Sequence, residues 1–327
     1  MNVPARTRIE PRPSGARRTW YLILRIGLPV RCSGEDPARH LRIVQKELRP
    51  LSTVVRRMDV GSEVNSIGHY LLRFQRYSRD DIAATRLAEA FLYGMSLLHG
   101  PMIEDDPGSL ILRVPDSMVN GATAIQPETL IELERSRPPE ERDLDYPYSA
   151  VGGISATTAD RHEAAWRIAA VTFDNETLFD ATRFLKRSHD NFYVYPGQIR
   201  EVACDRQASP PSSSHQTHFE DALHNAFKAI EAVIGDPPKD DRKFFDKIKA
   251  IGIDPAEPVG YDERLPISTV IRTMNEARDK RSAHGSTGRR TIRPAELLDF
   301  QACADVIVLA AIERARGSSV FDGVGSA

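Results

Sequence analysis

The stretch Phe219–Gly235, FEDALHNAFKAIEAVIG, carries the clearest helical pattern in the chain. Gly235 and the prolines at 237 and 238 predict where this helix ends. The helix has to bury its apolar face against other helices, because one side of it is apolar along its whole length. The residues of that face recur at intervals of three and four: Phe219, Leu223, Ala226, Phe227, Ile230, Val233 and Ile234.

Similar patterns predict further helices on both sides of this stretch. Helices of this length, joined by short links, are typical of an antiparallel bundle. We expect an all-α helical bundle over residues 160–318, with its core at 217–316 and a Ser/Pro-rich linker at 206–216. The other expected helices lie at 161–173, 177–188, 240–251, 265–283 and 294–316.

Residues 19–158 have a mixed pattern and predict an α+β domain that precedes the bundle. No chemical motif in this half indicates its role. We expect a basic disordered tail at 1–18, a loop at 134–150 and a second tail at 319–327. Within the domain, strands are expected at 19–30, 70–74 and 109–114, and helices at 36–48 and 80–98.

Composition limits the classes of function. The 327 residues suffice for two domains, and a net charge of −2 excludes a molecule that binds nucleic acid through its overall charge. No apolar run approaches the roughly 20 residues of a membrane helix, and the N-terminus lacks the apolar core of a secretory signal. Cys32, Cys204 and Cys303 form no CxxC pair, which favours the reducing cytoplasm and disfavours a structural zinc site. We expect a cytoplasmic protein with no cofactor, no metal and no membrane partner.

The stretch Asn275–Gly285, NEARDKRSAHG, carries the chemistry. It follows an apolar helical face that runs directly into Arg278. A guanidinium in that position is costly to bury unless it is paired or meets an anion. His284, which can transfer protons near neutral pH, comes six positions later, and Gly285 is a natural helix stop.

The order of these elements resembles the HEPN superfamily of helical bundles, which is found in prokaryotic ribonuclease toxins and phage-defence proteins. The signature of that family is an arginine, usually followed by a polar residue, four to six residues before a histidine. Asp279 supplies the polar residue here, and five residues separate Arg278 from His284. A second match to the spacing, Arg183-x5-His189, lacks these flanking features, and we expect it to be incidental.

The resemblance implies a metal-independent endoribonuclease in a toxin or phage-defence context. The 2′-OH of the RNA would attack the adjacent phosphate, with His284 as acid or base, Arg278 on the phosphate and Asp279 orienting either of them. It also implies a homodimer that joins two such motifs, an RNA substrate, and an antitoxin or defence-system partner. The expected RNA-binding or supporting residues are Lys280, Arg281, Lys228, Glu231 and His224.

Other interpretations of the same residues stay open. Arg278 can instead form a structural ion pair with Asp279, Glu276 or Glu231, and His284 can serve as a helix cap. His224, Lys228 and Glu231 can form a solvated helix face, and Cys303 fits a small core residue. The alternative function is a catalytically inactive HEPN module that binds RNA, a nucleotide or a protein.

Overall fold

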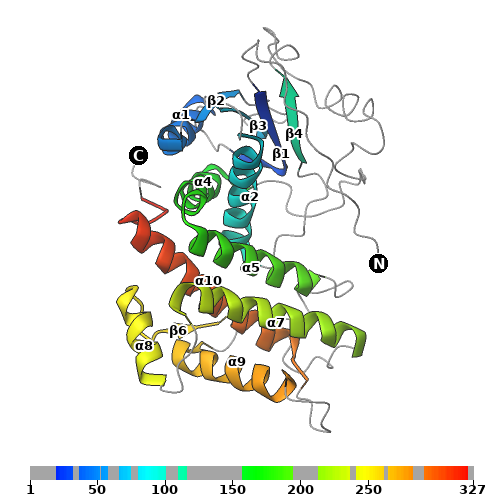
Figure 1. Ribbon diagram of the computed structural model, residues 1–327, viewed down its shortest axis with the longest axis vertical. Helices are drawn as coiled ribbons and strands as arrows, with labels where there is room; N and C mark the ends of the chain where they lie inside the picture. The colour runs from blue at the N-terminus through cyan, green and yellow to red at the C-terminus, as the bar shows by residue number, and fades with distance from the viewer. Residues whose placement is uncertain are drawn as a thin grey trace, which may run out of the picture.

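The computed structural model describes residues 20–31, 37–51, 53–57, 66–74, 80–100, 110–115, 157–193, 213–235, 241–260, 264–282 and 291–322. This part of the chain is mostly helical (Figure 1). The tail expected at 1–18, the loop expected at 134–150, and both Cys32 and Cys204 lie outside the described residues. None of the helices in the described part has the length and apolarity needed to cross a membrane.

A mainly antiparallel sheet forms in the N-terminal part of the chain, with strand order β2-β3-β1-β4, and the short strand β5 pairs parallel to β1. The central strand β1 pairs with β3 and β4, so that Leu24 lies opposite Tyr70 on one side and Ile111 on the other. Strands occupy the three stretches for which the sequence predicts them. The short strands β2 and β5 were not expected. The strands are β1 (Trp20–Arg31), β2 (Thr53–Arg57), β3 (Ser66–Phe74), β4 (Leu110–Pro115) and β5 (Thr157–Thr158).

Eight α-helices lie in the described residues. Seven of them match the predicted helices to within a few residues, although α5 continues to Tyr193, five residues beyond its predicted end. The eighth, α7, begins earlier than expected. The helices are α1 (Pro37–Leu48), α2 (Asp80–His99), α4 (Ala159–Phe173), α5 (Glu176–Tyr193), α7 (Ser213–Ile234), α8 (Asp241–Ala250), α9 (Ile267–Ser282) and α10 (Pro294–Arg316).

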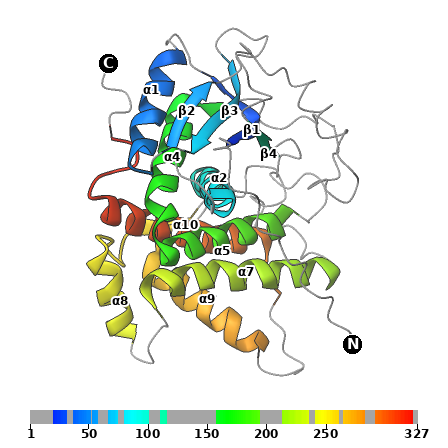
Figure 2. The same ribbon diagram turned by 45° about the horizontal axis from the view of Figure 1, so that its top comes forward.

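The expected domain boundary near residue 159 is not a gap in the packing. Helix α2, which precedes it, packs against α4 and α5, which follow it (Figures 1 and 2). The rings of Phe91 and Trp166 stack with centroids 4.1 Å apart. At Gly94 a Cβ would come within 3.0 Å of the Ala165 carbonyl oxygen, so this glycine allows α2 and α4 to approach closely. One apolar cluster therefore joins residues from both sides of the boundary.

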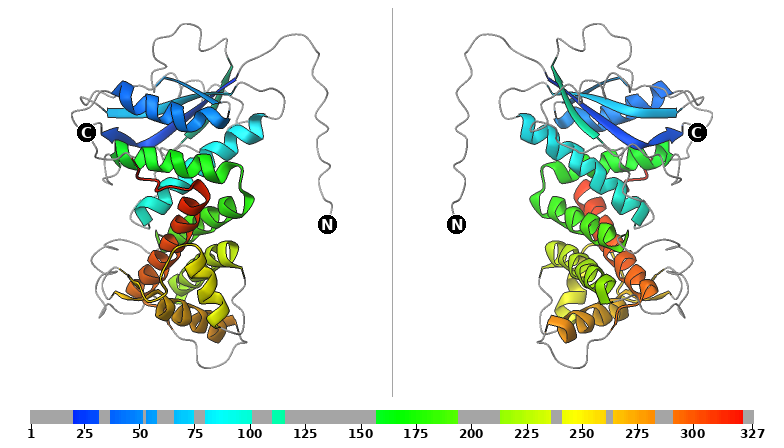
Figure 3. Two further views of the ribbon diagram at one scale, coloured as in Figure 1. Left: turned by 90° about the vertical axis from the view of Figure 1, so that its left-hand side faces the viewer. Right: turned by 90° about the vertical axis from the view of Figure 1, so that its right-hand side faces the viewer.

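The C-terminal part is a layered arrangement of helices in which α7 lies between α5 and α9 (Figures 2 and 3). Helix α10 packs against α5, α7 and α9, and its apolar residues join those of α7 in one large core cluster. The helix stripe predicted from the sequence is the buried one, since Leu223, Ala226 and Ile230 are fully buried. This packing brings Glu231 of α7 next to Arg278 in the C-terminal half of α9.

Two expectations about irregular segments are wrong for the residues that the structure describes, 213–216 of the linker and 319–322 of the tail. Helix α7 begins at Ser213, inside the linker expected at 206–216, and the Gln216 side chain exchanges two hydrogen bonds with the backbone of Ile292. At the start of the tail expected at 319–327, Val320 is fully buried, and its carbonyl accepts a 2.7 Å hydrogen bond from Arg167. In both places a polar or short segment is held by contacts with residues distant in sequence, which local composition does not reveal.

Candidate functional site

Helix α9 places Arg278 at the end of a buried apolar stripe. Ile267, Val270, Ile271, Met274 and Ala277 are each at most 4% exposed. Their spacing of three and four residues keeps them on the face that packs against α7 and α10. Arg278 follows on the edge of this face, and its side chain is 26% exposed.

Within the part of the chain that the structure describes, Glu231, Asn275 and Phe227 contact the guanidinium of Arg278. Nη1 donates a hydrogen bond of 2.6 Å to Oε1 of Glu231, and Nη2 donates one of 3.0 Å to Oδ1 of Asn275. The guanidinium carbon also lies 4.1 Å from the centre of the Phe227 ring. A planar guanidinium that is bonded along its edge and stacked on its face has a fixed orientation. Of the three carboxylates considered in the sequence, the structure shows Glu231 bonded to Arg278.

Sequence reasoning missed two of these contacts. Asn275 lies three positions before Arg278, a spacing at which side chains meet on a helix, so this contact could have been found. Phe227 was assigned to the core face of α7, and it is indeed 1% exposed. Its second role as the surface on which Arg278 stacks depends on how α7 and α9 pack, which periodicity does not give.

His224 and Lys228 lie on the same outer face of α7 as Glu231. Burial lowers the pKa of His224, and the charges of Lys228 and Arg278 lower it further, against the opposing effect of Asp221 and Glu220. Lys228 is exposed, and its ammonium lies 5.8 Å from the centre of the Phe184 ring. Of the α7 residues of the expected site, Glu231 contacts Arg278 and His224 lies near enough to feel its charge, whereas the ammonium of Lys228 lies beside Phe184 of α5.

The remaining residues of the motif are not placed by the structure. Asp279, Lys280 and Arg281 belong to α9, but their side chains lie outside the described part of the chain. His284 and Gly285 follow the last described residue of α9. The proximity of His284 to Arg278 therefore stays a prediction from their spacing.

The second match to the motif spacing is split between two environments. Arg183 is a surface residue that pairs with Asp180 at 2.8 Å. His189 is 1% exposed, and its Nδ1 shares a 2.8 Å hydrogen bond with the hydroxyl of Ser96. Its Nε2 lies 3.2 Å from Oδ1 of Asp305, within ion-pair distance but without the geometry of a hydrogen bond. His189 thus joins α2, α5 and α10 in the interior.

Cys303 and the possible metal ligands were also considered from the sequence. Cys303 is fully buried in the core, as expected, and burial raises the pKa of its thiol. Across the described residues, no three His, Cys, Asp or Glu side chains gather in a way that would hold a metal ion. The described part of the chain therefore offers no candidate set of metal ligands.

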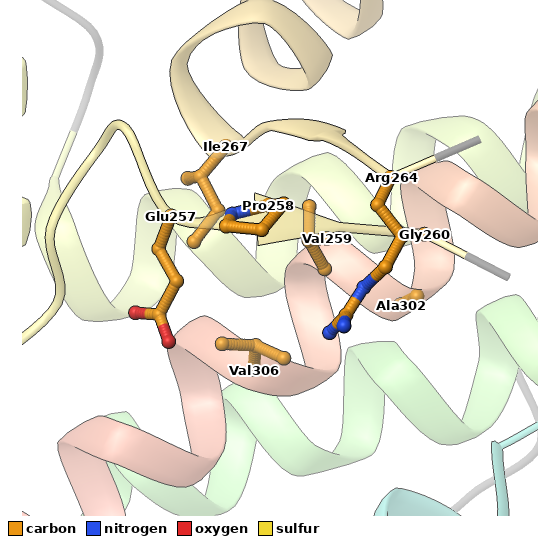
Figure 4. Close-up of a pocket in the computed structure, with 8 residues that line it drawn as sticks. All are labelled: Glu257, Pro258, Val259, Gly260, Arg264, Ile267, Ala302 and Val306. Carbon is orange, nitrogen blue, oxygen red and sulfur yellow. The ribbon is translucent and has the colours of Figure 1, made fainter.

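A separate pocket of about 250 Å³ lies at the other end of α9 (Figure 4). Two short strands that the sequence did not predict, β6 (Pro258–Val259) and β7 (Leu265–Pro266), pair beside it. Its lining includes Ile267, the first residue of α9, whereas Arg278 lies about 16 Å further along the helix axis. The pocket and Arg278 are therefore two distinct features.

No protein-family model matches the chain, and no curated protein or solved structure matches it either. The function has to be argued from the site alone.

Proposed function

We propose that the chain is a metal-independent endoribonuclease of the HEPN type, acting in a toxin or phage-defence setting. In this proposal an α+β domain precedes the helical bundle, and the bundle carries the catalytic motif. RNA is the substrate, and the active form is a homodimer joined through the bundle.

The orientation of Arg278 is the observation that supports this proposal best. Its guanidinium is bonded to Glu231 and Asn275 and stacked on Phe227, with about a quarter of the side chain exposed. A cation that is already oriented can stabilise the charge that develops on a phosphate without reorganising during the reaction. Arginine also binds phosphate oxygens through two parallel hydrogen bonds, which suits a crowded phosphorane.

The chemistry needs an acid and a base as well as a cation. His284 takes the proton of the attacking 2′-OH or gives one to the leaving 5′-oxygen, and one motif supplies only one histidine. A two-fold dimer supplies both histidines and brings Arg278, Lys280 and Arg281 together from two chains. This local concentration of positive charge would allow a chain with a net charge of −2 to bind RNA.

The Arg278–Glu231 ion pair also supports a second candidate, an inactive module that binds RNA or a nucleotide. Glu231 already accepts a hydrogen bond from Nη1, so part of the guanidinium is engaged before any phosphate arrives. In that case Arg278 would hold α9 against α7 and contribute to binding without accelerating cleavage.

The identity of the RNA ends and the mass of the particle test the proposal. Purified protein is incubated with labelled RNA, and the products are examined for a 2′,3′-cyclic phosphate, while light scattering measures the molecular mass. Arg272→Ala is a matched control for Arg278→Ala, because Arg272 also lies on α9 and above a phenylalanine, Phe245. We expect a dimer and RNA products that carry cyclic phosphate ends. Arg278→Ala should abolish or slow the cleavage, whereas Arg272→Ala should leave its rate unchanged. Intact RNA that is still retained by the protein would favour the second candidate.

A further inference from the structure

The pocket at the first turn of α9 has opposite charges at its two ends and an apolar floor. Glu257 and Arg264 extend on either side of β6 towards α10, with Val306 between and below them (Figure 4). Both charged residues are exposed. The floor and walls between them are apolar, formed by Pro258, Val259, Ile267, Ala302 and Val306.

The β6–β7 pairing sets how far apart the backbone positions of Glu257 and Arg264 are. Val259 pairs with Leu265 in the β6–β7 ladder, so Arg264 stands opposite Gly260, three residues beyond Glu257. Three residues of extended chain span about 10 Å. Since both side chains lean towards α10 and are flexible, the two charges suit a ligand whose own charges are separated by several bonds.

The apolar floor of the pocket suits a ligand whose middle part is also apolar. Val306 is 39% exposed and is one of three large hydrophobic residues that are exposed in the described part of the chain. A chain of methylene groups laid over Val306 and Ala302 would remove this surface from water.

We propose that this pocket binds a zwitterion whose ammonium and carboxylate are separated by a short aliphatic chain. Glu257 pairs with the ammonium, and Arg264 pairs with the carboxylate, which a guanidinium can grip with two hydrogen bonds. Val306 and Ala302 contact the methylene groups. Free lysine and a lysine at the C-terminus of a peptide share this chemistry. The site is independent of Arg278 and of the proposed cleavage reaction.

Three small molecules of similar length separate the contributions of the ammonium, the carboxylate and the aliphatic chain to binding. The probes are 6-aminohexanoate with both charges, hexanoate with only the anion and hexylamine with only the cation, titrated against the full-length protein while methyl NMR signals of Val306 and Val259 are followed. We expect saturable shifts with 6-aminohexanoate. Each single-charge probe should bind about three- to fivefold more weakly, which is the scale of one exposed ion pair.

Variants test which residues hold each charge. Glu257→Gln should weaken 6-aminohexanoate to the level of hexanoate, and Arg264→Gln to the level of hexylamine, while Arg314→Gln, an exposed arginine further along α10, should change nothing. Free lysine and a peptide ending in lysine, compared with its C-terminal amide, distinguish the two sources of the ligand. The proposal is overturned if 6-aminohexanoate causes no shift, if all three probes bind equally, or if the double variant Glu257→Gln/Arg264→Gln binds as the wild type does. RNA cleavage by these variants is unaffected in either case.

Discussion

Arg278 and Glu231 are 47 positions apart in the sequence, and Nη1 of the first donates a 2.6 Å hydrogen bond to Oε1 of the second. This ion pair joins α9 to α7 at the place where the motif begins. Both side chains are about three-quarters buried. The pair therefore stabilises the packing of the two helices and also sets the direction of the guanidinium.

Glu231→Gln tests both roles of the pair. The amide keeps the shape of the side chain but removes its charge, so we expect the free energy of unfolding to fall by about 1–2 kcal/mol. If Arg278 acts on the phosphate, cleavage by the folded variant should also slow, because a neutral amide holds the guanidinium less firmly than the carboxylate does. Urea unfolding and initial rates measure the two effects. Glu257→Gln, at an exposed position, is the control and should stay within about 0.5 kcal/mol of the wild type. Unchanged stability and rate in Glu231→Gln would refute a role for the pair.

Arg278 and His284 are predicted to act as one unit on one phosphodiester. Either single alanine substitution should then slow cleavage at least about 100-fold, the scale of a lost acid–base or charge-stabilising group. The double variant should be little slower than the singles, since groups that act together are not additive. Arg278→Lys should also fail, because an ammonium cannot make the two-point contact. Initial rates from all four variants decide this, and strictly multiplicative losses would argue against a shared step.

His189→Ala is expected to change stability rather than catalysis. The substitution removes the hydrogen bond with Ser96 and the imidazole that lies 3.2 Å from Oδ1 of Asp305 in the interior. Burial already raises the pKa of Asp305, so its carboxylate is costly to leave alone. We expect the free energy of unfolding to fall by about 1–3 kcal/mol. The cleavage rate per folded molecule should stay close to that of the wild type. A well-folded His189→Ala protein with as little activity as His284→Ala would show that the wrong motif was chosen.

Because His162 is buried, we expect the free energy of unfolding to fall in acid. It is fully buried, 5.6 Å from the ring of Phe91, and burial lowers its pKa well below the ordinary 6.5, with His40 and His99 lowering it further. The fold therefore holds His162 neutral, whereas the unfolded chain takes up a proton as the pH falls below 6.5. Stability due to this group is complete above that pH and is lost on acidification, by up to about 1.4 kcal/mol per pH unit.

Urea midpoints measured from neutral pH downwards check this prediction. His162→Gln should flatten the dependence below pH 6.5, whatever its effect at neutral pH. Burial, and then the charge of Arg161, lower the pKa of His99 to about 4. His99→Gln should therefore have a smaller effect, confined to the pH range between 6.5 and about 4. An identical slope in His162→Gln and the wild type would contradict the prediction.

Local periodicity was sufficient to locate most helices. The helix expected at about 294–316 matches α10, because Pro294 marks its start and Gly317 adopts the left-handed conformation, with φ of +80°, that ends it. The start of α7 was missed, since its first turn is rich in serine and polar residues, which are typical of linkers. The two-residue strands β6 and β7 are too short for any alternating pattern.

The candidate site was predictable only in part, for a related reason. Helical spacing places Glu231 with His224 and Lys228 on one face of α7, and Arg278 at the end of the α9 stripe. Which faces of two helices meet depends on side-chain packing over the whole core. The sequence could therefore narrow the partners of Arg278 to three carboxylates but could not choose among them.

RNA cleavage in the presence of EDTA, by the wild type and by His284→Ala, tests the central claim most directly. Both proteins are first shown to have the same melting curve, so that any difference in rate reflects chemistry. The account predicts that the wild type cleaves labelled RNA with chelator present and leaves 2′,3′-cyclic phosphate ends, while His284→Ala is at least about 100-fold slower. Undiminished cleavage by well-folded His284→Ala, or cleavage that stops in EDTA and returns with magnesium or manganese, would contradict it.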